Sequence, residues 1–339
     1  MISFPQQELG EKMRQKLLAA LLAFGCLCGF TVTAKAQSAE TNWPTRPITM
    51  VVAYPPGAIT DTVGRRVAER LSQALNVQVV VENRGGAGGN VAAAFVSRAA
   101  PDGYTLLFTS YGNLIIAAAA DLNVGFHPWR DLAPVGMIGP MTVVLMVRPG
   151  LQVNTLQDFV RHIAANPGRV NFASVGVGSS YHLLIEQMMV YGKLNMTHVP
   201  YRGGAAAMTD FLAGRVDATL ATLLFARPYM QDNRGIGVAV GNAERSPVLP
   251  NVPAVQEVIP GAKLTDGLAV LAPAATPPTI IARANRALQD LINQPAMRDW
   301  LTNEGVPPRP GPPEAFMAEM APATEELRKL LREAAIKVE

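Results

Sequence analysis

The fold of this chain is decided by the stretch Ile48-Thr49-Met50-Val51-Val52-Ala53-Tyr54-Pro55-Pro56-Gly57-Ala58-Ile59-Thr60-Asp61. Its first six residues predict a strand, and the Pro-Pro-Gly run predicts a turn. Thr60 and Asp61 then stand where a helix would be capped, ahead of an amphipathic run from Val63 to Leu75. A strand that passes through a short turn into a helix is the opening unit of an α/β fold.

The turn after this strand is a candidate anion site. The first amides of a helix have no partner within the helix, and the helix dipole adds partial positive charge at the same place. A carboxylate fits such a site as well as a phosphate does. Residues 54–61 contain no lysine and lack the spacing of a P-loop, so nucleotide binding is the poorer interpretation.

Strand-like and helix-like runs alternate through the rest of the chain. Strands are predicted at 48–53, 77–81, 105–108, 132–138, 142–147, 170–173, 196–199, 218–220, 237–240 and 268–272. Helices are predicted at 60–75, 155–166, 181–191, 205–213, 278–293, 295–303 and 313–335. Continuous apolar strands with helices between them indicate parallel sheets that are covered on both faces.

The length and punctuation of the chain predict two α/β lobes. Turns near Arg148-Pro149-Gly150 and Pro260-Gly261 are the predicted crossings between them. Lobe 1 would comprise residues 43–148 and 262–339, and lobe 2 would comprise residues 149–261. Because ligands of open α/β sheets bind at the carboxyl ends of the strands, we expect the site in the cleft between the lobes.

The N-terminus predicts export. Lys12, Arg14 and Lys16 precede an apolar stretch from Leu17 to Val32, and Ala34-Lys35-Ala36 supplies small residues at a cleavage site. This pattern is typical of a signal peptide over residues 1–36 that is cleaved after Ala36. An uncleaved anchor and a lipoprotein site at Cys26 are the alternatives.

Composition narrows the function further. Both cysteines, Cys26 and Cys28, lie in the signal segment, so the exported chain would have no disulfide and no thiolate nucleophile or ligand. Secretion without cysteine indicates a bacterial periplasm. Residues 1–36 hold four basic and two acidic residues, so the formal charge of +3 falls to +1 on cleavage. Without a basic cluster, the chain offers nothing for nucleic acid.

A second turn of the same kind follows a later strand. It reads Ala173-Ser174-Val175-Gly176-Val177-Gly178-Ser179-Ser180-Tyr181-His182 and again opens a helix. Its glycines let a ligand approach the backbone, and its serines add hydroxyl and amide donors. The dinucleotide fingerprint is excluded by its glycine spacing. A plain tight turn with a serine N-cap remains the alternative.

Several segments together resemble one family. They are Arg46-Pro47-Ile48, Tyr54-Pro55-Pro56-Gly57 with Thr60-Asp61, Val81-Glu82-Asn83-Arg84-Gly85-Gly86-Ala87-Gly88-Gly89-Asn90, Ala100-Pro101-Asp102-Gly103-Tyr104-Thr105-Leu106-Leu107, Val199-Pro200-Tyr201-Arg202-Gly203-Gly204, Arg245-Ser246-Pro247 and Leu271-Ala272-Pro273. In this order and spacing the chain resembles the substrate-binding proteins of tripartite tricarboxylate transporters, the Bug/TctC family, over nearly all of residues 43–339.

The resemblance implies a two-lobed Venus-flytrap fold of the periplasmic-binding-protein type II kind. It also implies a small organic carboxylate as ligand, membrane permease subunits as partners, a monomer, and no cofactor, metal or catalysis. In that family two loops hold the carboxylate. Here they would be the first loop, Tyr54–Asp61, and the second loop, Ser174–His182. The site residues so predicted are Tyr54, Pro56, Gly57, Ala58, Thr60, Asp61, Thr109, Ser110, Tyr111, Ser174, Gly176, Gly178, Ser179, Ser180, His182, Ala221 and Thr222.

Three of these positions depart from the family pattern: Ala58 stands in place of a frequent second Gly, which is a mild change, and the other two are Ala221 and Thr222. Many relatives carry Asp-Asn where this chain has Ala221-Thr222, and in amino-acid-binding members the Asp can pair with the ligand ammonium. A methyl group and a hydroxyl cannot replace that charge, so an amino acid is disfavoured. An apolar or aromatic carboxylate becomes the better candidate, with Tyr111, Tyr181 and Phe225 as walls.

Catalysis and sensing remain as alternatives. Ser179 and His182 could form a hydrolase dyad, although no nucleophile elbow surrounds them. The four histidines lack metal-ligand spacing. A receptor of this kind could also signal to a histidine kinase instead of serving a permease.

Overall fold

The computed structural model describes residues 42–334, 336 and 338. The predicted signal peptide, its cleavage site and both cysteines lie outside the described residues. Every helix and strand described below lies within Arg46–Glu339. Within the described part, no helix is both long and apolar enough to cross a bilayer.

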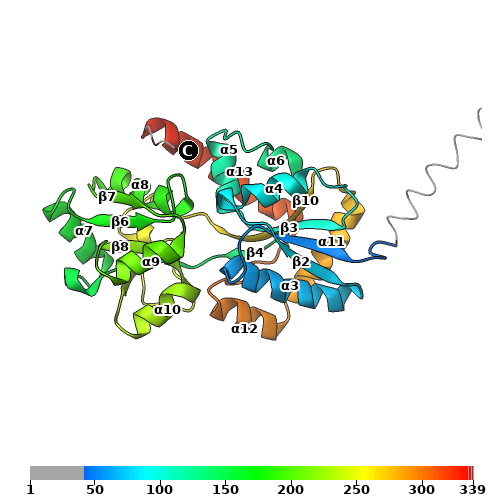
Figure 1. Ribbon diagram of the computed structural model, residues 1–339, viewed down its shortest axis with the longest axis horizontal. Helices are drawn as coiled ribbons and strands as arrows, with labels where there is room; N and C mark the ends of the chain where they lie inside the picture. The colour runs from blue at the N-terminus through cyan, green and yellow to red at the C-terminus, as the bar shows by residue number, and fades with distance from the viewer. Residues whose placement is uncertain (1–41, 335, 337, 339) are drawn as a thin grey trace, which may run out of the picture. The chain divides into compact units, whose positions relative to one another are not determined.

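The first of two five-stranded sheets has the strand order β2-β1-β3-β10-β4 (Figure 1). Its strands are β1 (Ile48–Val52), β2 (Val79–Asn83), β3 (Thr105–Ser110), β4 (Leu132–Pro140) and β10 (Gly267–Pro273). The central strands are apolar on both sides: every residue of β10 is buried. Such strands need a layer of helices on each face.

The second sheet has the strand order β7-β6-β8-β5-β9. Its strands are β5 (Val143–Val147), β6 (Asn171–Ser174), β7 (Thr197–Pro200), β8 (Ala218–Thr222) and β9 (Ile236–Val240). Strand β5 lies between β8 and β9 and is wholly buried. All ten strands therefore lie at or within a few residues of their predicted positions.

Both sheets are mixed, so the prediction of parallel sheets was wrong. Strand β10 runs antiparallel to β3 and β4, and β5 runs antiparallel to β8 and β9. The physical reason is the route of the chain. Each antiparallel strand is the first one that the chain forms after passing from one sheet into the other, so it enters from the opposite side.

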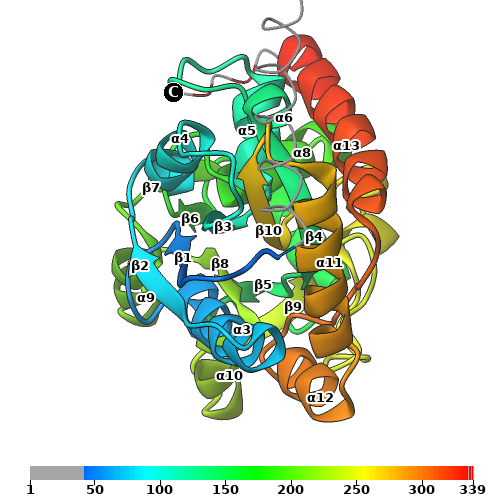
Figure 2. The same cartoon turned by 90° about the vertical axis from the view of Figure 1, so that its right-hand side faces the viewer.

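Helices cover both faces of the first sheet (Figure 2). One face packs against α3 (Ile59–Leu75) and α11 (Pro278–Ile292), which α12 (Pro295–Asn303) follows. The other face packs against α4 (Asn90–Ser97), α5 (Gly112–Ala119) and α13 (Pro313–Glu333), with the short α6 (Pro128–Asp131) beside β4. The core on that face includes Phe316 and Met320 of α13.

The second sheet is covered by α7 (Leu156–Ala165), α8 (Ser180–Gly192), α9 (Gly204–Leu212) and α10 (Leu223–Gln231). Phe211 of α9 and Ala226 of α10 pack on Val144 and Met146 of β5. Three short 3-10 turns, Ala87–Gly89, Pro149–Leu151 and Val255–Glu257, complete the elements of the described chain. Helices α4, α5, α6 and α10 were not predicted.

The predicted boundary after Arg148 assigns β5 to the first lobe, whereas β5 is hydrogen-bonded into the second sheet. The chain passes from the first sheet to the second between Pro140 and Val143, and it returns between Val240 and Gly267. The exact limits of the two lobes stay a prediction.

Candidate functional site

The first loop is fixed by the carboxylate of Asp61. The amide of Gly57 donates to Asp61 Oδ2 at 2.9 Å, and Asn83 Nδ2 donates to Asp61 Oδ1 at 2.7 Å. Arg65 Nε lies 2.9 Å from the same oxygen. Burial acts to raise the pKa of Asp61, but these donors outweigh it and hold the pKa below its ordinary value. Asp61 therefore stabilises the turn instead of presenting a free carboxylate.

The N-terminus of α3 has no side-chain cap. Its N-cap is Ala58, with φ −67° and ψ 157°, so the prediction that Thr60 or Asp61 caps the helix was wrong. Within the described chain, the amides of Ile59, Thr60 and Asp61 have no hydrogen-bond acceptor. An alanine N-cap thus leaves open the amides that a serine or aspartate would occupy.

Tyr54 links the first loop to the neighbouring turns. Its hydroxyl donates to the carbonyl of Gly88 at 3.0 Å and accepts from Asn113 Nδ2 at 2.8 Å. Its own carbonyl accepts from Asn83 Nδ2 at 3.0 Å. Burial, followed by the nearby Asp266 carboxylate, raises the pKa of the Tyr54 phenol well above its usual value. The phenol is therefore a neutral donor at neutral pH.

Asp266, immediately before β10, accepts hydrogen bonds from both sheets' loops. Ser110 Oγ at the end of β3 donates to Oδ1 at 2.5 Å, and the Gly112 amide at the start of α5 donates to the same oxygen at 3.0 Å. Ser180 Oγ of α8 donates to Oδ2 at 3.2 Å. The carboxylate thus lies between the N-termini of α5 and α8, which favours its charge.

Glycines let the chain close around this carboxylate. A Cβ on Gly112 would lie 2.5 Å from Asp266 Cγ, and one on Gly267 would lie 2.4 Å from the Gly139 carbonyl oxygen. Asp266 is only 4% exposed. Burial raises its pKa, although the hydrogen bonds from Ser110, Gly112, Gly267 and Ser180 oppose that shift.

The serine hydroxyls of the second loop all have partners within the protein. Ser179 Oγ caps α8 by accepting from the His182 amide at 3.2 Å, and it donates to the Gly176 carbonyl at 2.7 Å. Ser174 Oγ lies 2.6 Å from His198 Nε2, and Ser180 Oγ is bound to Asp266. In the described chain the amides of Ser180 and Tyr181 have no acceptor, so free donors stand at the start of α8.

Two stacked histidines lie against the second loop. The rings of His182 in α8 and His198 in β7 are 4.2 Å apart and 18° from parallel. The Gly178 amide donates to His182 Nδ1 at 3.2 Å, and His182 Nε2 lies 3.2 Å from Glu186 Oε1. A ring that accepts at Nδ1 carries its proton at Nε2, so these partners assign a neutral tautomer.

This arrangement does not support the predicted dyad of Ser179 and His182. Both ring nitrogens of His182 face other groups, namely the Gly178 amide and the Glu186 carboxylate. The Ser179 hydroxyl donates its proton to the Gly176 carbonyl. The histidine is therefore not placed to take a proton from that hydroxyl.

Some predicted lining residues lie inside the core of the structure. Tyr111 is 1% exposed and packs edge-on against Phe316 at 5.8 Å in the first sheet's core, and its role as a wall of the site stays a prediction. Thr109 is equally buried and donates to the Ser110 carbonyl. Phe225, by contrast, is 49% exposed at the start of α10.

Ala221 and Thr222, the two residues at which this chain departs from the family's Asp-Asn, end β8. Ala221 is buried in the second sheet's core. The Oγ1 atom of Thr222 is buried, and no group in the described chain accepts or donates a hydrogen bond to it. A buried hydroxyl without a partner is costly in a native protein and needs an explanation. A ligand group is the explanation that we adopt below.

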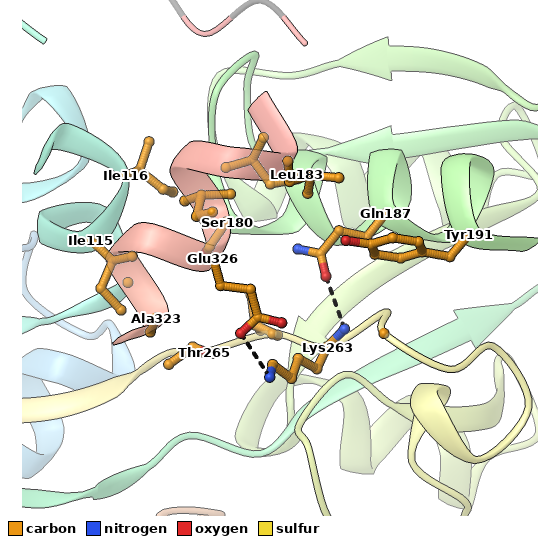
Figure 3. Close-up of a pocket in the computed structure, with 15 residues that line it drawn as sticks. Ile115, Ile116, Ser180, Leu183, Gln187, Tyr191, Lys263, Thr265, Ala323 and Glu326 are labelled. Carbon is orange, nitrogen blue, oxygen red and sulfur yellow. Dashed lines mark hydrogen bonds and ion pairs between the residues drawn. The ribbon is translucent and has the colours of Figure 1, made fainter. Parts of the chain in front are cut away.

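A cavity of about 50 Å³ lies behind Asp266, between α5, α8 and α13 (Figure 3). Ile115, Leu183 and Leu327 form apolar walls, and Lys263 Nζ pairs with Glu326 at 2.9 Å at its edge. Ser180 is its only lining residue among the predicted site residues.

Among the described residues, no group of three or more His, Cys, Asp or Glu side chains could hold a metal ion. Sequence reasoning missed Asp266, Asn83, Asn113 and His198 as members of this network. For Asp266 the available signal was its position: a lone acid directly before a wholly apolar strand. The asparagines lie in runs that otherwise read as turns.

The chain matches a known family over most of its length. The sequence profile described as "Tripartite tricarboxylate transporter family receptor" matches residues 63–331. The protein BugT of Bordetella pertussis is 32% identical over 327 residues, which cover 95% of this chain and 98% of BugT.

Solved structures show the same architecture. R. palustris Rpa4515 with adipate superposes with a TM-score of 0.78 at 29% identity, over 87% of this chain and 99% of that one. MatC from Rhodopseudomonas palustris with bound malate gives a TM-score of 0.74, also at 29% identity, over 85% of this chain and 100% of that one. A third, the periplasmic binding protein BugD, gives 0.75 at 27% identity, over 87% and 99%.

Proposed function

Because the chain belongs to the receptors of the tripartite tricarboxylate transporter family, we propose that it binds a small organic carboxylate between its first and second loops. Receptors of this family are periplasmic, have two lobes, and bind small carboxylates for the membrane components of a transporter. Two relatives were solved with adipate and with malate, both of which are dicarboxylates.

The observation that supports this proposal most strongly is the pair of helix N-termini with free amides. The amides of Ile59, Thr60 and Asp61 begin α3, and those of Ser180 and Tyr181 begin α8. Ser110 at the end of β3 and Ser180 at the start of α8 both donate hydrogen bonds to Asp266, which supports a shared site for the two loops. Helix N-termini bind anions through such amides and through the dipole.

The proposal assigns the carboxylate to backbone amides and not to the serine hydroxyls, which have partners within the protein. Amides on rigid helix starts lose no side-chain entropy when they bind. The charge is then stabilised without a buried arginine. Thr222 Oγ1, buried and unpartnered, would donate to the far end of the ligand.

Closure would couple binding to transport. Ligand contacts made to both loops favour the state in which the lobes are together, and the permease would recognise that state. We propose export by the segment 1–36 with cleavage after Ala36, a periplasmic monomer, and no catalytic turnover. Service to a kinase sensor instead of a permease would require the same closed form.

A thermal-shift screen of the purified protein against mono- and dicarboxylates tests the proposal, beginning with adipate and malate. An acid at a hundred times its Kd should stabilise the protein by about 2.7 kcal/mol. Its methyl ester should give no shift, because the esterified oxygens no longer carry the charge. If no acid in a broad panel raises the melting temperature, the receptor proposal fails; ester hydrolysis abolished by Ser179→Ala would favour the hydrolase.

A further inference from the structure

The stacked histidines His182 and His198 hold the second loop through hydrogen bonds to it. These bonds form without any contact between the histidines and a ligand. His182 Nδ1 accepts the Gly178 amide, and His198 Nε2 meets Ser174 Oγ at 2.6 Å. Both contacts lie in the segment that leads to the free amides of Ser180 and Tyr181. The orientation of those amides therefore depends on two imidazoles.

The contact to Gly178 exists only while His182 is neutral. A protonated imidazole carries hydrogen at both nitrogens, so Nδ1 can no longer accept from an amide. The second nitrogen does not interfere, because Glu186 Oε1 can accept from Nε2 in either state. One proton on His182 thus breaks one hydrogen bond of the loop and leaves the other contact of the ring intact.

The surroundings of the two rings differ. His182 Nε2 lies 3.2 Å from Glu186 Oε1 on the same helix, whereas His198 on β7 stacks on His182 and has Ser174 Oγ as its partner. Burial, and then His182, lowers the pKa of His198 to about 4, while Glu186 opposes that shift. Asp266 contacts Ser180, two residues earlier in α8, and the facing helix α5 carries no ionisable side chain.

We propose that His182 and His198 are positioning residues for the carboxylate-binding amides of the second loop, and that one proton on His182 loosens this loop and weakens carboxylate binding. Only the statement about carboxylate binding rests on the proposed function. The proton also adds one positive charge beside the loop, and the proposal holds that the lost contact to the Gly178 amide outweighs this charge. The receptor would then release its acid more readily in acidic surroundings.

The first arm of the test needs no ligand. The ring nitrogens of the histidines and the Gly178 amide are followed by NMR from pH 8 to pH 5 in the full chain. In the wild type the Gly178 amide resonance should shift with the titration of His182. In His182→Asn, whose Oδ1 can accept at the place of Nδ1 and cannot be protonated, it should stay constant. A Gly178 resonance that ignores the titration of His182 overturns the proposal.

The second arm measures affinity for whichever of adipate, malate or the screened acids binds, between pH 8 and pH 5.5. Protonation of His182 predicts weaker binding at pH 5.5 than at pH 8, and the loss should level off once the contact to Gly178 is broken. His182→Asn should flatten this pH dependence, and His162→Asn on α7, a matched control, should keep it. His198→Ala should weaken binding at pH 7.5, and His198→Gln should restore it.

The two arms separate this inference from the proposed function. If no acid binds at any pH, the proposed function fails, and the NMR arm still decides whether His182 holds the loop. If an acid binds with the same slope in the wild type and in His182→Asn, the pH dependence belongs to another group and the inference is wrong. Tighter binding at low pH would contradict it as well.

Discussion

At the scale of single residues, the loops are built so that side chains serve the protein and the backbone serves the ligand. Asp61 accepts the Gly57 amide, and Ser179 accepts the His182 amide. Each holds one amide near its helix start and leaves the neighbouring amides open. A hydroxyl can rotate, whereas an amide in the first turn of a helix cannot, so the donors that remain free are also the ones fixed in direction.

Thr222 allows a direct test of ligand contact. Thr222→Val keeps the shape of the side chain and removes a buried hydroxyl that has no partner in the described chain. The ligand-free protein should be as stable as the wild type or slightly more so, because no hydrogen bond is lost. Carboxylate affinity should fall by about 0.5–1.5 kcal/mol. Unchanged affinity in a titration would show that Thr222 does not face the ligand.

Position 221, next to Thr222, tests whether a negative charge added at the end of β8 weakens the binding of a carboxylate. The double substitution Ala221→Asp, Thr222→Asn places a carboxylate in the core at the end of β8. We expect the affinity for an apolar carboxylate to fall by about tenfold or more. The introduced carboxylate must lose its hydration in the core, and it also lies near the ligand's own negative charge. Equal affinities of the double variant and the wild type, measured by calorimetry, would remove these positions from the site.

Asp61 should matter for stability in a pH-dependent manner. Its folded pKa is below the ordinary value of 3.8, so its contribution is present above that pH and is lost as the pH falls through the folded pKa. Asp61→Ala should lower the free energy of unfolding at pH 7 by about 1–3 kcal/mol, since the Gly57 amide and Asn83 lose their acceptor. Asp61→Asn, which keeps one acceptor oxygen, should lose less in a urea titration.

At the scale of elements, the sequence was most informative about strands. Their apolar runs are bounded by Gly and Pro, and all ten were predicted. The missed helices share a physical cause: none shows the amphipathic pattern. Helix α4 starts from left-handed glycines, α5 is apolar all round, and α10 contains Pro228. Tertiary packing decides such segments, because their own sequence resembles loop or core.

The packing of His198 on β7 against His182 on α8 makes the stability of the protein depend on pH. The folded pKa of His198, about 4, lies below the ordinary 6.5. The unfolded chain therefore takes up the proton first, and the free energy of unfolding falls as the pH drops from about 6.5 to about 4. We expect a loss of about 2 kcal/mol by pH 5 in the wild type, and none from this source in His198→Gln. The urea midpoint of each protein is measured from pH 7 to pH 5. If the midpoint falls equally in the wild type and in His198→Gln, the assignment to His198 is wrong.

At the scale of the whole molecule, Asp266 ties strand β10 to α5 and α8, and so connects the elements of both sheets. Its position before an apolar strand marks the residue in the sequence, but its role could not be found there, because its donors come from positions 110, 112 and 180, which only the fold brings together. The site's two loops, in contrast, were found because each is a local strand–turn–helix pattern. A local sequence pattern does not predict which distant segments come into contact.

Substitutions of Asp266 separate its charge from its hydrogen bonds. Its raised folded pKa means that the charged form is disfavoured on folding, so stability is lost as the pH rises through that pKa. Asp266→Asn, which keeps an acceptor for Ser110 and Gly112, should leave the melting temperature at pH 7 unchanged or raise it. Asp266→Ala leaves those buried donors unpaired and should lower stability by about 3 kcal/mol or more. A larger loss in Asp266→Asn than in Asp266→Ala would contradict this account.

The central claim is that backbone amides at two helix starts hold the ligand's carboxylate. The most direct measurement compares the carboxylate affinity of Ser180→Pro with that of Ser180→Ala, by calorimetry. Both variants lose the hydroxyl bound to Asp266, but only proline removes the amide, and proline is well tolerated at the first helical position, as in α11, α12 and α13. We predict that Ser180→Pro binds at least tenfold more weakly than Ser180→Ala. Equal affinities would contradict the account.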